Sequence, residues 1–184
     1  METKEFLKAV EFCKKFDKIV VTAQQRSGTT ITGKSLAYSL GWEYVDESKM
    51  KLKNITTFPK LLINKKKFVV QQPGFRMILE QYIGDIKKYK VGVVVVKRDI
   101  EDIQKSRRRI GWKAANELVD LEKTKDIGLK NPVIRAEYNV LHLEYLLKTY
   151  PNFVFLFNYK DLEGHHFWIP KEKRLKFRPK QTTL

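Results

Sequence analysis

The sequence contains little cysteine and little histidine. Its 184 residues include one cysteine and three histidines. A single cysteine excludes an internal disulfide and favours a reducing compartment, and the amphipathic segment around Cys13 predicts a small core residue. Three histidines, His142, His165 and His166, are too few and too dispersed for a metal centre. The pair His165 and His166 is predicted to lie in a surface turn.

Long hydrophobic runs are also missing. No apolar stretch approaches the roughly 20 residues that span a membrane, and the first residues, METKEFLKAVEF, lack the apolar core of a signal peptide. The sequence therefore predicts a soluble, cytoplasmic protein.

Acidic residues are outnumbered. The chain has 37 Lys and Arg against 21 Asp and Glu, a net charge of +16. This excess predicts attraction to polyanions, anionic ligands or nucleic acid, although a solvated lysine-rich surface would give the same composition. The hydrophobic fraction of 42% is that of a globular protein. We expect one domain over residues 1–184, with a core at 18–163 and a basic tail at 164–184.

Apolar, β-branched runs alternate with helical patterns along the chain. The predicted strands are 19–21, 42–46, 68–70, 91–96 and 153–157, and the predicted helices are 2–16, 29–40, 77–83, 99–109 and 131–150. A basic loop over 49–67 and a charged helix or connection over 117–126 complete the chain. This alternation predicts a three-layer, P-loop-like α/β fold. Its central, mainly parallel sheet would have about four to five strands flanked by helices.

The stretch from Lys18 to Gly41 reads KIVVTAQQRSGTTITGKSLAYSLG. It predicts a buried strand, a polar glycine-containing loop and a helix that ends at Gly41. Loops of this kind bind phosphate-like anions, because backbone N–H groups and the positive end of the helix dipole face the ligand.

Two alignments of this loop are open. Residues 28–35, GTTITGKS, satisfy the G-x-x-x-x-G-K-[ST] pattern of a nucleotide P-loop, in which Lys34 and Ser35 would serve a kinase or NTPase with Mg²⁺. That pattern needs its first glycine directly after the strand, whereas Gly28 lies several residues beyond Val21. Alternatively the helix begins near residues 28–30, which places Gly33 and Lys34 inside it. A loop without any ligand is the third possibility.

In the second alignment the loop resembles the 5′-phosphosulfate loop of the sulfotransferase family, a basic residue followed by Ser-Gly-Thr-Thr. The matching residues here are Arg26, Ser27, Gly28, Thr29 and Thr30. The resemblance implies transfer of a sulfuryl group from 3′-phosphoadenosine-5′-phosphosulfate (PAPS) to a hydroxyl or amine, leaving the product PAP. It implies that Arg26 and the loop N–H groups stabilise the departing oxygen without a metal.

A second pair of residues has a spacing that resembles a pattern of the same family. Arg98 ends the strongest strand, in VVVVKRDIEDIQKSRRR, and Ser106 lies eight residues later on the next helix. In sulfotransferases an Arg and a Ser at this spacing hold the 3′-phosphate of PAPS. The family's proline is absent here, since residues 100–102 are Ile-Glu-Asp. A surface ion pair of Arg98 beside an uninvolved Ser106 is the alternative.

Weaker similarities are FVVQQPGF and FVFLFNYKDL, which extend the resemblance over roughly residues 18–163. The first places Gln71 where relatives have Lys or His, and a glutamine cannot act as a general base. Asp46 or Glu47, at the end of the second strand, is the predicted replacement. We expect the acceptor to be a small molecule or a glycan, and the sequence does not identify which one.

A nucleic-acid-binding module is the remaining alternative class. Its residues would be the basic segments 65–67, 105–113 and 171–180, with Phe167, Trp168 and Phe177 stacking on bases. Nothing in these segments matches a known reading motif.

Overall fold

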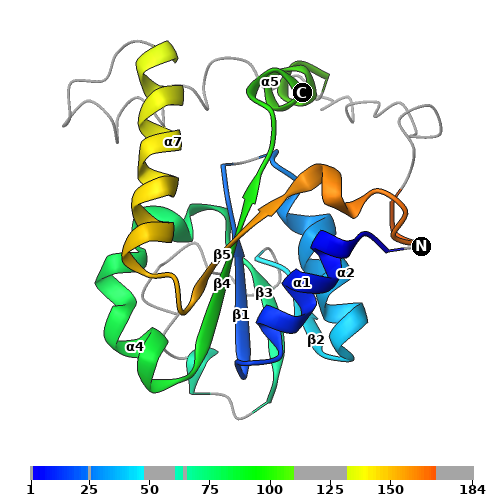
Figure 1. Cartoon of the computed structure of the whole chain (residues 1–184), viewed down its shortest axis with the longest axis vertical. Helices are drawn as coiled ribbons and strands as arrows, with labels where there is room; N and C mark the ends of the chain where they lie inside the picture. Colours follow the sequence, from blue (N-terminus) through cyan, green and yellow to red (C-terminus); the bar gives the residue numbers. More distant parts are fainter. Residues whose placement is uncertain (1, 25, 48–60, 64–65, 110–131, 169–184) are drawn as a thin grey trace, which may run out of the picture.

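Five parallel strands form the centre of the structure (Figure 1). The computed structural model describes residues 2–24, 26–47, 61–63, 66–109 and 132–168. The strands are β1 (Lys18–Thr22), β2 (Glu43–Val45), β3 (Phe68–Gln71), β4 (Val91–Lys97) and β5 (Val154–Asn158), in the order β2-β3-β1-β4-β5. The predicted α/β fold and its parallel sheet are therefore confirmed.

Strand β4 lies between β1 and β5 and is buried from Val91 to Val96. Its continuous run of valines fits this place, because a strand covered on both faces needs apolar side chains at every position. The register sets Val20 of β1 opposite Val70 of β3 and Val93 of β4. The three inner strands therefore begin and end at the same two edges.

Helices cover both faces of the sheet. On one face lie α1 (Lys4–Cys13) and α2 (Thr29–Leu40); on the other lie α4 (Ile83–Lys88), α7 (Pro132–Thr149) and the 3₁₀ turns η2 (Pro73–Met77) and η3 (Leu79–Tyr82). Helix α5 (Ile100–Arg109) follows β4 beyond the carboxyl edge, and the 3₁₀ turn η4 (Tyr159–Leu162) follows β5. The predicted helix over 77–83 is thus made of 3₁₀ turns leading into α4.

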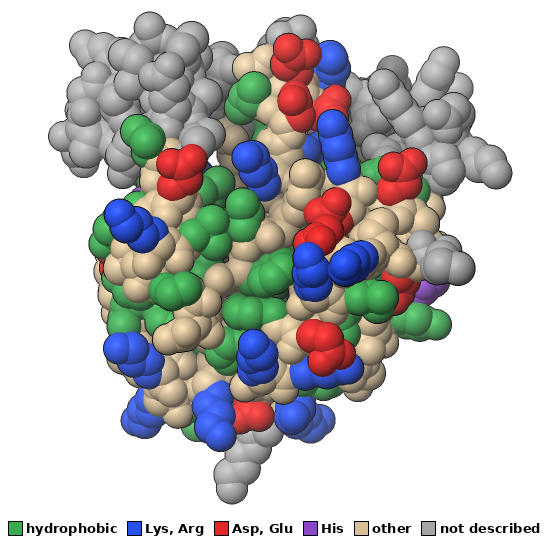
Figure 2. Space-filling view, viewed as in Figure 1, with side chains coloured by type: hydrophobic (Ala, Val, Ile, Leu, Met, Phe, Trp, Pro, Cys, Tyr) green, Lys and Arg blue, Asp and Glu red, His purple; other side chains and the backbone are tan. Residues whose placement is uncertain are grey.

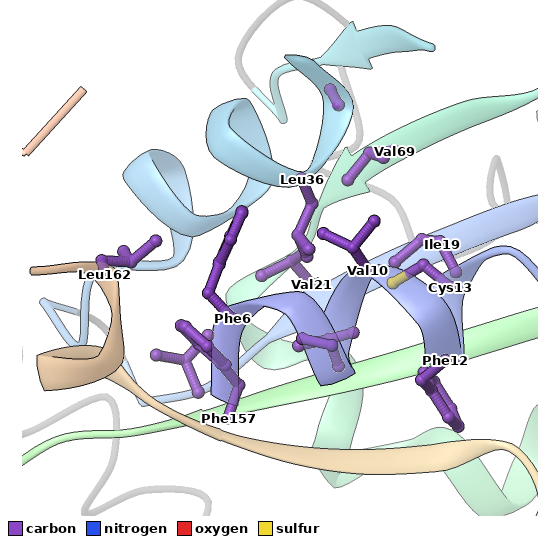
Figure 3. Packing of buried hydrophobic residues seen from close by; sticks show 14 of the residues in the cluster. Phe6, Val10, Phe12, Cys13, Ile19, Val21, Leu36, Val69, Phe157 and Leu162 are labelled. Carbon is purple, nitrogen blue, oxygen red and sulfur yellow. The ribbon is translucent and has the colours of Figure 1, made fainter. Parts of the chain in front are cut away.

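The core under α1 combines aliphatic side chains with a few aromatic rings (Figure 3). Phe6 of α1 meets Phe157 of β5 edge to face, with ring centroids 6.0 Å apart. Cys13 is fully buried in this cluster, as its place in an amphipathic segment predicts. Burial raises the pKa of the Cys13 thiol, so the residue acts as a small apolar side chain.

Helix ends follow the signals in the sequence. The Asp99 carboxylate accepts hydrogen bonds from the backbone N–H groups of Glu101 (2.8 Å) and Asp102 (3.3 Å), so it caps α5. Gly41 ends α2 in the left-handed conformation (φ 66°), which costs glycine little.

The sequence of α7 predicts an apolar stripe of Tyr138, Leu141, Tyr145 and Leu146, and this prediction is partly wrong. Leu141 is 63% exposed and Tyr145 is 47% exposed, whereas Leu146 is fully buried against the sheet. Leu143 and Leu147 pack beside Leu146. The helix carries apolar residues on more than one face, so its periodicity alone does not identify the face that packs.

The expected charged segment 117–126 and most of the basic loop 49–67 lie outside the described residues, as does the tail beyond Trp168. Among the helices that the structure describes, none is both long enough and apolar enough to cross a membrane.

Gly92 gives a test of the packing between β4 and the end of α1. A Cβ atom added at Gly92 would lie 2.6 Å from Phe16 Cδ2 and 2.9 Å from Ile19 Cδ1, whereas one at Gly84 in α4 meets open space. We expect Gly92→Ala to lower the free energy of unfolding by about 1–3 kcal/mol. Gly84→Ala should leave it unchanged or raise it by up to about 1 kcal/mol. Urea denaturation of both variants measures this, and equal effects would contradict the packing described.

Candidate functional site

A cavity opens at the carboxyl edge of the sheet, between the ends of β1 and β4. Strands β2 and β3 lie on one side of β1, and β4 and β5 lie on the other. This arrangement makes the gap between β1 and β4 the topological switch point, where doubly wound sheets bind ligands. The cavity measures about 760 Å³. Its polar and charged lining residues are Gln24, Ser27, Arg76, Lys97, Arg98, Asp99, Asn158 and Lys160.

The loop after β1 enters α2 through a left-handed glycine. Gly28 has φ 96°, and a Cβ atom there would overlap the ring of Tyr159. Helix α2 begins at Thr29, and Gly28 has no side chain to cap it. The N–H groups of the first helical turn therefore lack an intrahelical acceptor, and this end of α2 can receive an anion.

The helix start decides between the two alignments of the loop. Gly33 and Lys34 lie inside α2, more than one turn from Thr29. Gly33 is needed because a Cβ atom there would lie 2.9 Å from the Tyr44 ring, and Lys34 Nζ lies 5.8 Å from the centre of that ring. Ser35 is fully buried beside His165. Most of the P-loop pattern therefore lies within α2 rather than in a loop ahead of it, and Ser35 is not among the residues that line the cavity.

Three of the predicted site residues come together beside the loop. Arg26 Nε donates to Ser106 Oγ at 3.3 Å, and Arg98 Nη1 donates to the backbone carbonyl of Arg26 at 3.0 Å. The Arg98 guanidinium lies over the Tyr159 ring, 4.4 Å from its centre. The end of β4, helix α5 and the loop after β1 thus bring two guanidinium groups and a hydroxyl to one place.

Asp46 and Glu47 lie on the opposite side of β1, after β2. The Tyr44 hydroxyl lies 3.3 Å from Asp46 Oδ2 and 2.9 Å from Gln71 Oε1, and Thr30 Oγ1 donates to the same Gln71 oxygen at 3.0 Å. These contacts connect Asp46 to the start of α2 through the side chains of Tyr44 and Gln71.

The titration behaviour of this group follows from burial and from neighbouring negative charge. Burial raises the pKa of Tyr44, and the Asp46 carboxylate raises it further. The phenol therefore stays protonated and acts as a donor. Burial, with Asp46 beside it, also raises the pKa of Glu47 above its ordinary range.

Sequence reasoning missed three residues of the site. Tyr159 lies between Gly28 and Arg98, and Tyr44 joins Gln71 to Asp46. Arg76 is only 8% exposed and lines the cavity. Its backbone N–H donates to Thr22 Oγ1 of β1 at 3.0 Å. No local sequence signal identifies these residues, because their contacts join segments that are far apart in the sequence.

The turn predicted for His165 and His166 is present, but the surface position predicted for His165 is wrong. The side chain is 2% exposed and lies against Phe6, with ring centroids 4.9 Å apart. Its Nδ1 accepts the backbone N–H of Phe167 at 3.2 Å and lies 3.2 Å from Ser35 Oγ. His166, in contrast, is exposed. His165 therefore joins the end of the described chain to α2.

The described residues give little support for a metal site or for a nucleic-acid-binding surface. No group of three or more His, Cys, Asp or Glu in the described ranges could hold a metal ion. Phe167 packs on Tyr38 and Trp168 packs on Tyr159, so neither ring stands free to stack on bases. Most of the basic segments proposed for nucleic acid, and Phe177, lie outside the described residues.

Comparison with protein-family models gives no match to this chain, and comparison with curated proteins also gives none.

His165 predicts a dependence of stability on pH. Burial lowers its pKa below the ordinary value of about 6.5, the nearby His166 acts in the same direction, and Glu2 opposes both. The unfolded chain then takes up a proton at higher pH than the folded one, so stability falls as pH drops below about 6.5. We expect His165→Gln to flatten this fall, measured by thermal unfolding between pH 7.5 and 5.

His166→Gln, at an exposed neighbour, is the matched control. It removes only the weaker contribution to the lowered pKa of His165, so it should flatten the fall much less than His165→Gln does. A residual slope in His165→Gln is expected, because burial and the nearby Arg76 also lower the pKa of His142. An unchanged slope in His165→Gln would show that the buried imidazole does not set the profile.

Proposed function

We propose that this protein binds PAPS and transfers its sulfuryl group to a hydroxyl or amine acceptor. The observation that carries the proposal is the meeting of Arg26, Arg98 and Ser106 beside the N-terminus of α2. Two sites for anions thus adjoin at the switch point of the sheet. A nucleotide with phosphate groups on both its 3′ and 5′ positions has the matching charges.

The residues at the 3′ side fit a phosphate. Within the described residues, Arg98 Nε is buried without a hydrogen-bond partner, and an unpaired buried donor is costly unless a ligand accepts from it. A guanidinium supplies a forked, permanently charged donor pair. Ser106 is itself buried and adds a short neutral donor.

The residues at the 5′ side fit a smaller anion. Gly28 has no side chain to cap the start of α2, so the first N–H groups of this helix are available to an anion. When the donor is bound, it supplies an activated sulfur–oxygen bond. The N–H groups of Gly28, Thr29 and Thr30 would stabilise the charge that develops on the bridging oxygen as this bond breaks.

A proton must leave the acceptor when its new bond to sulfur forms. Gln71 cannot take it, because an amide is no base and its oxygen already accepts from Tyr44 and Thr30. Asp46 is the better of the two candidate carboxylates, since the Tyr44 hydroxyl holds it beside this group. Glu47 shares the strand end without such a contact, and we assign it no step.

The proposal predicts that PAP stabilises the protein more than ATP with Mg²⁺ does. A ligand that binds only the folded state raises the melting temperature as its concentration exceeds Kd. ATP lacks the 3′-phosphate, and Ser35 is not placed to hold Mg²⁺. A thermal-shift series with each ligand measures this. Equal or greater stabilisation by ATP with Mg²⁺ would favour the kinase alternative.

Two variants distinguish the two alignments of the loop by their effect on PAP binding. Arg98→Ala should weaken PAP binding by about 2–4 kcal/mol, a loss of roughly 30- to 1000-fold. Lys34→Ala removes the same charge from the exposed side of α2 and should leave PAP binding unchanged. The reverse result would show that the P-loop alignment is the correct one.

The assignment of the base predicts a separation of binding from turnover. Asp46→Asn should lower the rate of PAPS conversion to PAP by about 100-fold or more and leave PAP affinity unchanged. Water serves as the acceptor here, so the assay needs no identified substrate: PAP and sulfate form, and the proton of water goes to Asp46. Glu47→Gln is the matched control. A larger loss in Glu47→Gln than in Asp46→Asn would reverse the assignment.

A further inference from the structure

The direction of the Arg26 side chain separates this protein from the pattern it resembles. In that pattern the basic residue before Ser-Gly-Thr-Thr serves the sulfuryl end of the donor. Here Arg26 Nε lies 3.3 Å from Ser106 Oγ, on the helix that follows β4. The side chain therefore extends toward α5, where the 3′-phosphate is proposed to bind.

The backbone of Arg26 is adapted to this direction. Its φ is 72°, one of two left-handed non-glycine residues in the described chain, and such residues are uncommon because of Cβ crowding. The carbonyl of the same residue accepts a hydrogen bond from Arg98 Nη1 at 3.0 Å. The backbone of Arg26 is thus held by the other arginine while its own side chain reaches Ser106.

The two arginines are joined by the hydrogen bond from Arg98 Nη1 to the Arg26 carbonyl, and both carry a positive charge. The guanidinium carbon of Arg98 lies 4.4 Å from the centre of the Tyr159 ring. Arg98 Nε has no hydrogen-bond partner within the described part of the chain. Bringing like charges together is unfavourable in a partly buried place, and a dianion between them would relieve this. A phosphate monoester has three oxygens, enough to accept from both forks and from the serine hydroxyl.

We infer that Arg26 belongs to the 3′-phosphate subsite, where it forms a clamp with Arg98 and Ser106. This inference rests on the proposed function. It has two consequences for that function. The charge that develops near sulfur is stabilised by the N–H groups of α2 alone, and donor selection depends strongly on the 3′-phosphate. Arg26 is then a residue that determines specificity for the donor.

Two isomeric nucleotides test the inference. Adenosine 3′-monophosphate and adenosine 5′-monophosphate carry the same charge and differ only in where the phosphate is attached. Arg26→Asn removes the guanidinium, and Asn tolerates the left-handed backbone, so this variant is expected to fold. Calorimetric titration of both isomers and of PAP into wild type and variant gives the comparison.

We expect Arg26→Asn to weaken the 3′ isomer and PAP by about 10- to 100-fold, the range for hydrogen bonds to charged groups. The 5′ isomer should bind the variant and the wild type equally. Arg26→Lys should recover part of the loss, because it restores charge without the fork. Lys105→Ala on α5, whose Nζ pairs with Glu101 at 3.4 Å on the exposed surface, controls for a general loss of positive charge.

Equal weakening of both isomers, or weakening of the 5′ isomer alone, would overturn the inference and return Arg26 to the sulfuryl end. Tighter binding of PAP to Arg26→Asn would also overturn it, since Arg26 would then compete with the ligand for Ser106. If wild type binds none of the three nucleotides, the proposed function itself fails. Thermal unfolding of the ligand-free variants distinguishes each of these outcomes from misfolding.

Discussion

The contact of Tyr159 with Gly28 and Arg98 fixes the carboxyl edge of this sheet. The ring occupies the space that any side chain at position 28 would need, and it supports the guanidinium of Arg98. Three segments far apart in the sequence, the ends of β1, β4 and β5, are thereby held against one another. Because the loop cannot move without losing this contact, the N-terminus of α2 and the arginine pair keep a constant relation. A rigid relation of this kind lowers the entropy lost when a ligand with two charged ends binds.

The basic residues are divided between the two edges of the sheet. All three arginines whose side chains are described, Arg26, Arg76 and Arg98, are at least partly buried and lie at the carboxyl edge. The opposite edge carries exposed lysines, such as Lys67 and Lys90 directly before β3 and β4, and Figure 2 shows basic side chains along that lower edge. Arginine suits fixed, forked recognition of an oxyanion, whereas lysine is a hydrated point charge. The net charge of +16 therefore says less about the site than the placement of a few arginines does.

Local signals in the sequence predict most of this fold and little of the geometry of the site. Apolar runs and one alternating segment predict all five strands, and Asp99 and Gly41 predict helix ends, because these features depend on nearby residues. The face of α7 is not predictable in this way, since Leu141 and Leu146 are equally apolar and only packing distinguishes them. Gly33 belongs to a P-loop pattern in the sequence, yet its observed role is to make room for Tyr44 of the next strand. The burial of His165 depends on a contact with Ser35 130 residues earlier, which no local pattern encodes.

The order of the strands separates the two halves of the proposed reaction. Asp46 follows β2 and Gln71 is the last residue of β3, whereas Arg98 and Ser106 follow β4. The loop after β1 lies between these groups. A donor held by its 3′ end on the β4 side must direct its 5′ end across the start of α2 toward β3. There Gln71 Oε1 accepts from both Thr30 and Tyr44, so this glutamine joins α2, β2 and β3. A lysine has no acceptor and a neutral histidine has only one acceptor nitrogen, so neither offers the amide oxygen that accepts both bonds here. Glutamine in place of the expected Lys or His therefore removes a positive charge from the proposed sulfuryl site. In return, Gln71 connects α2 to β2, the strand that Asp46 follows.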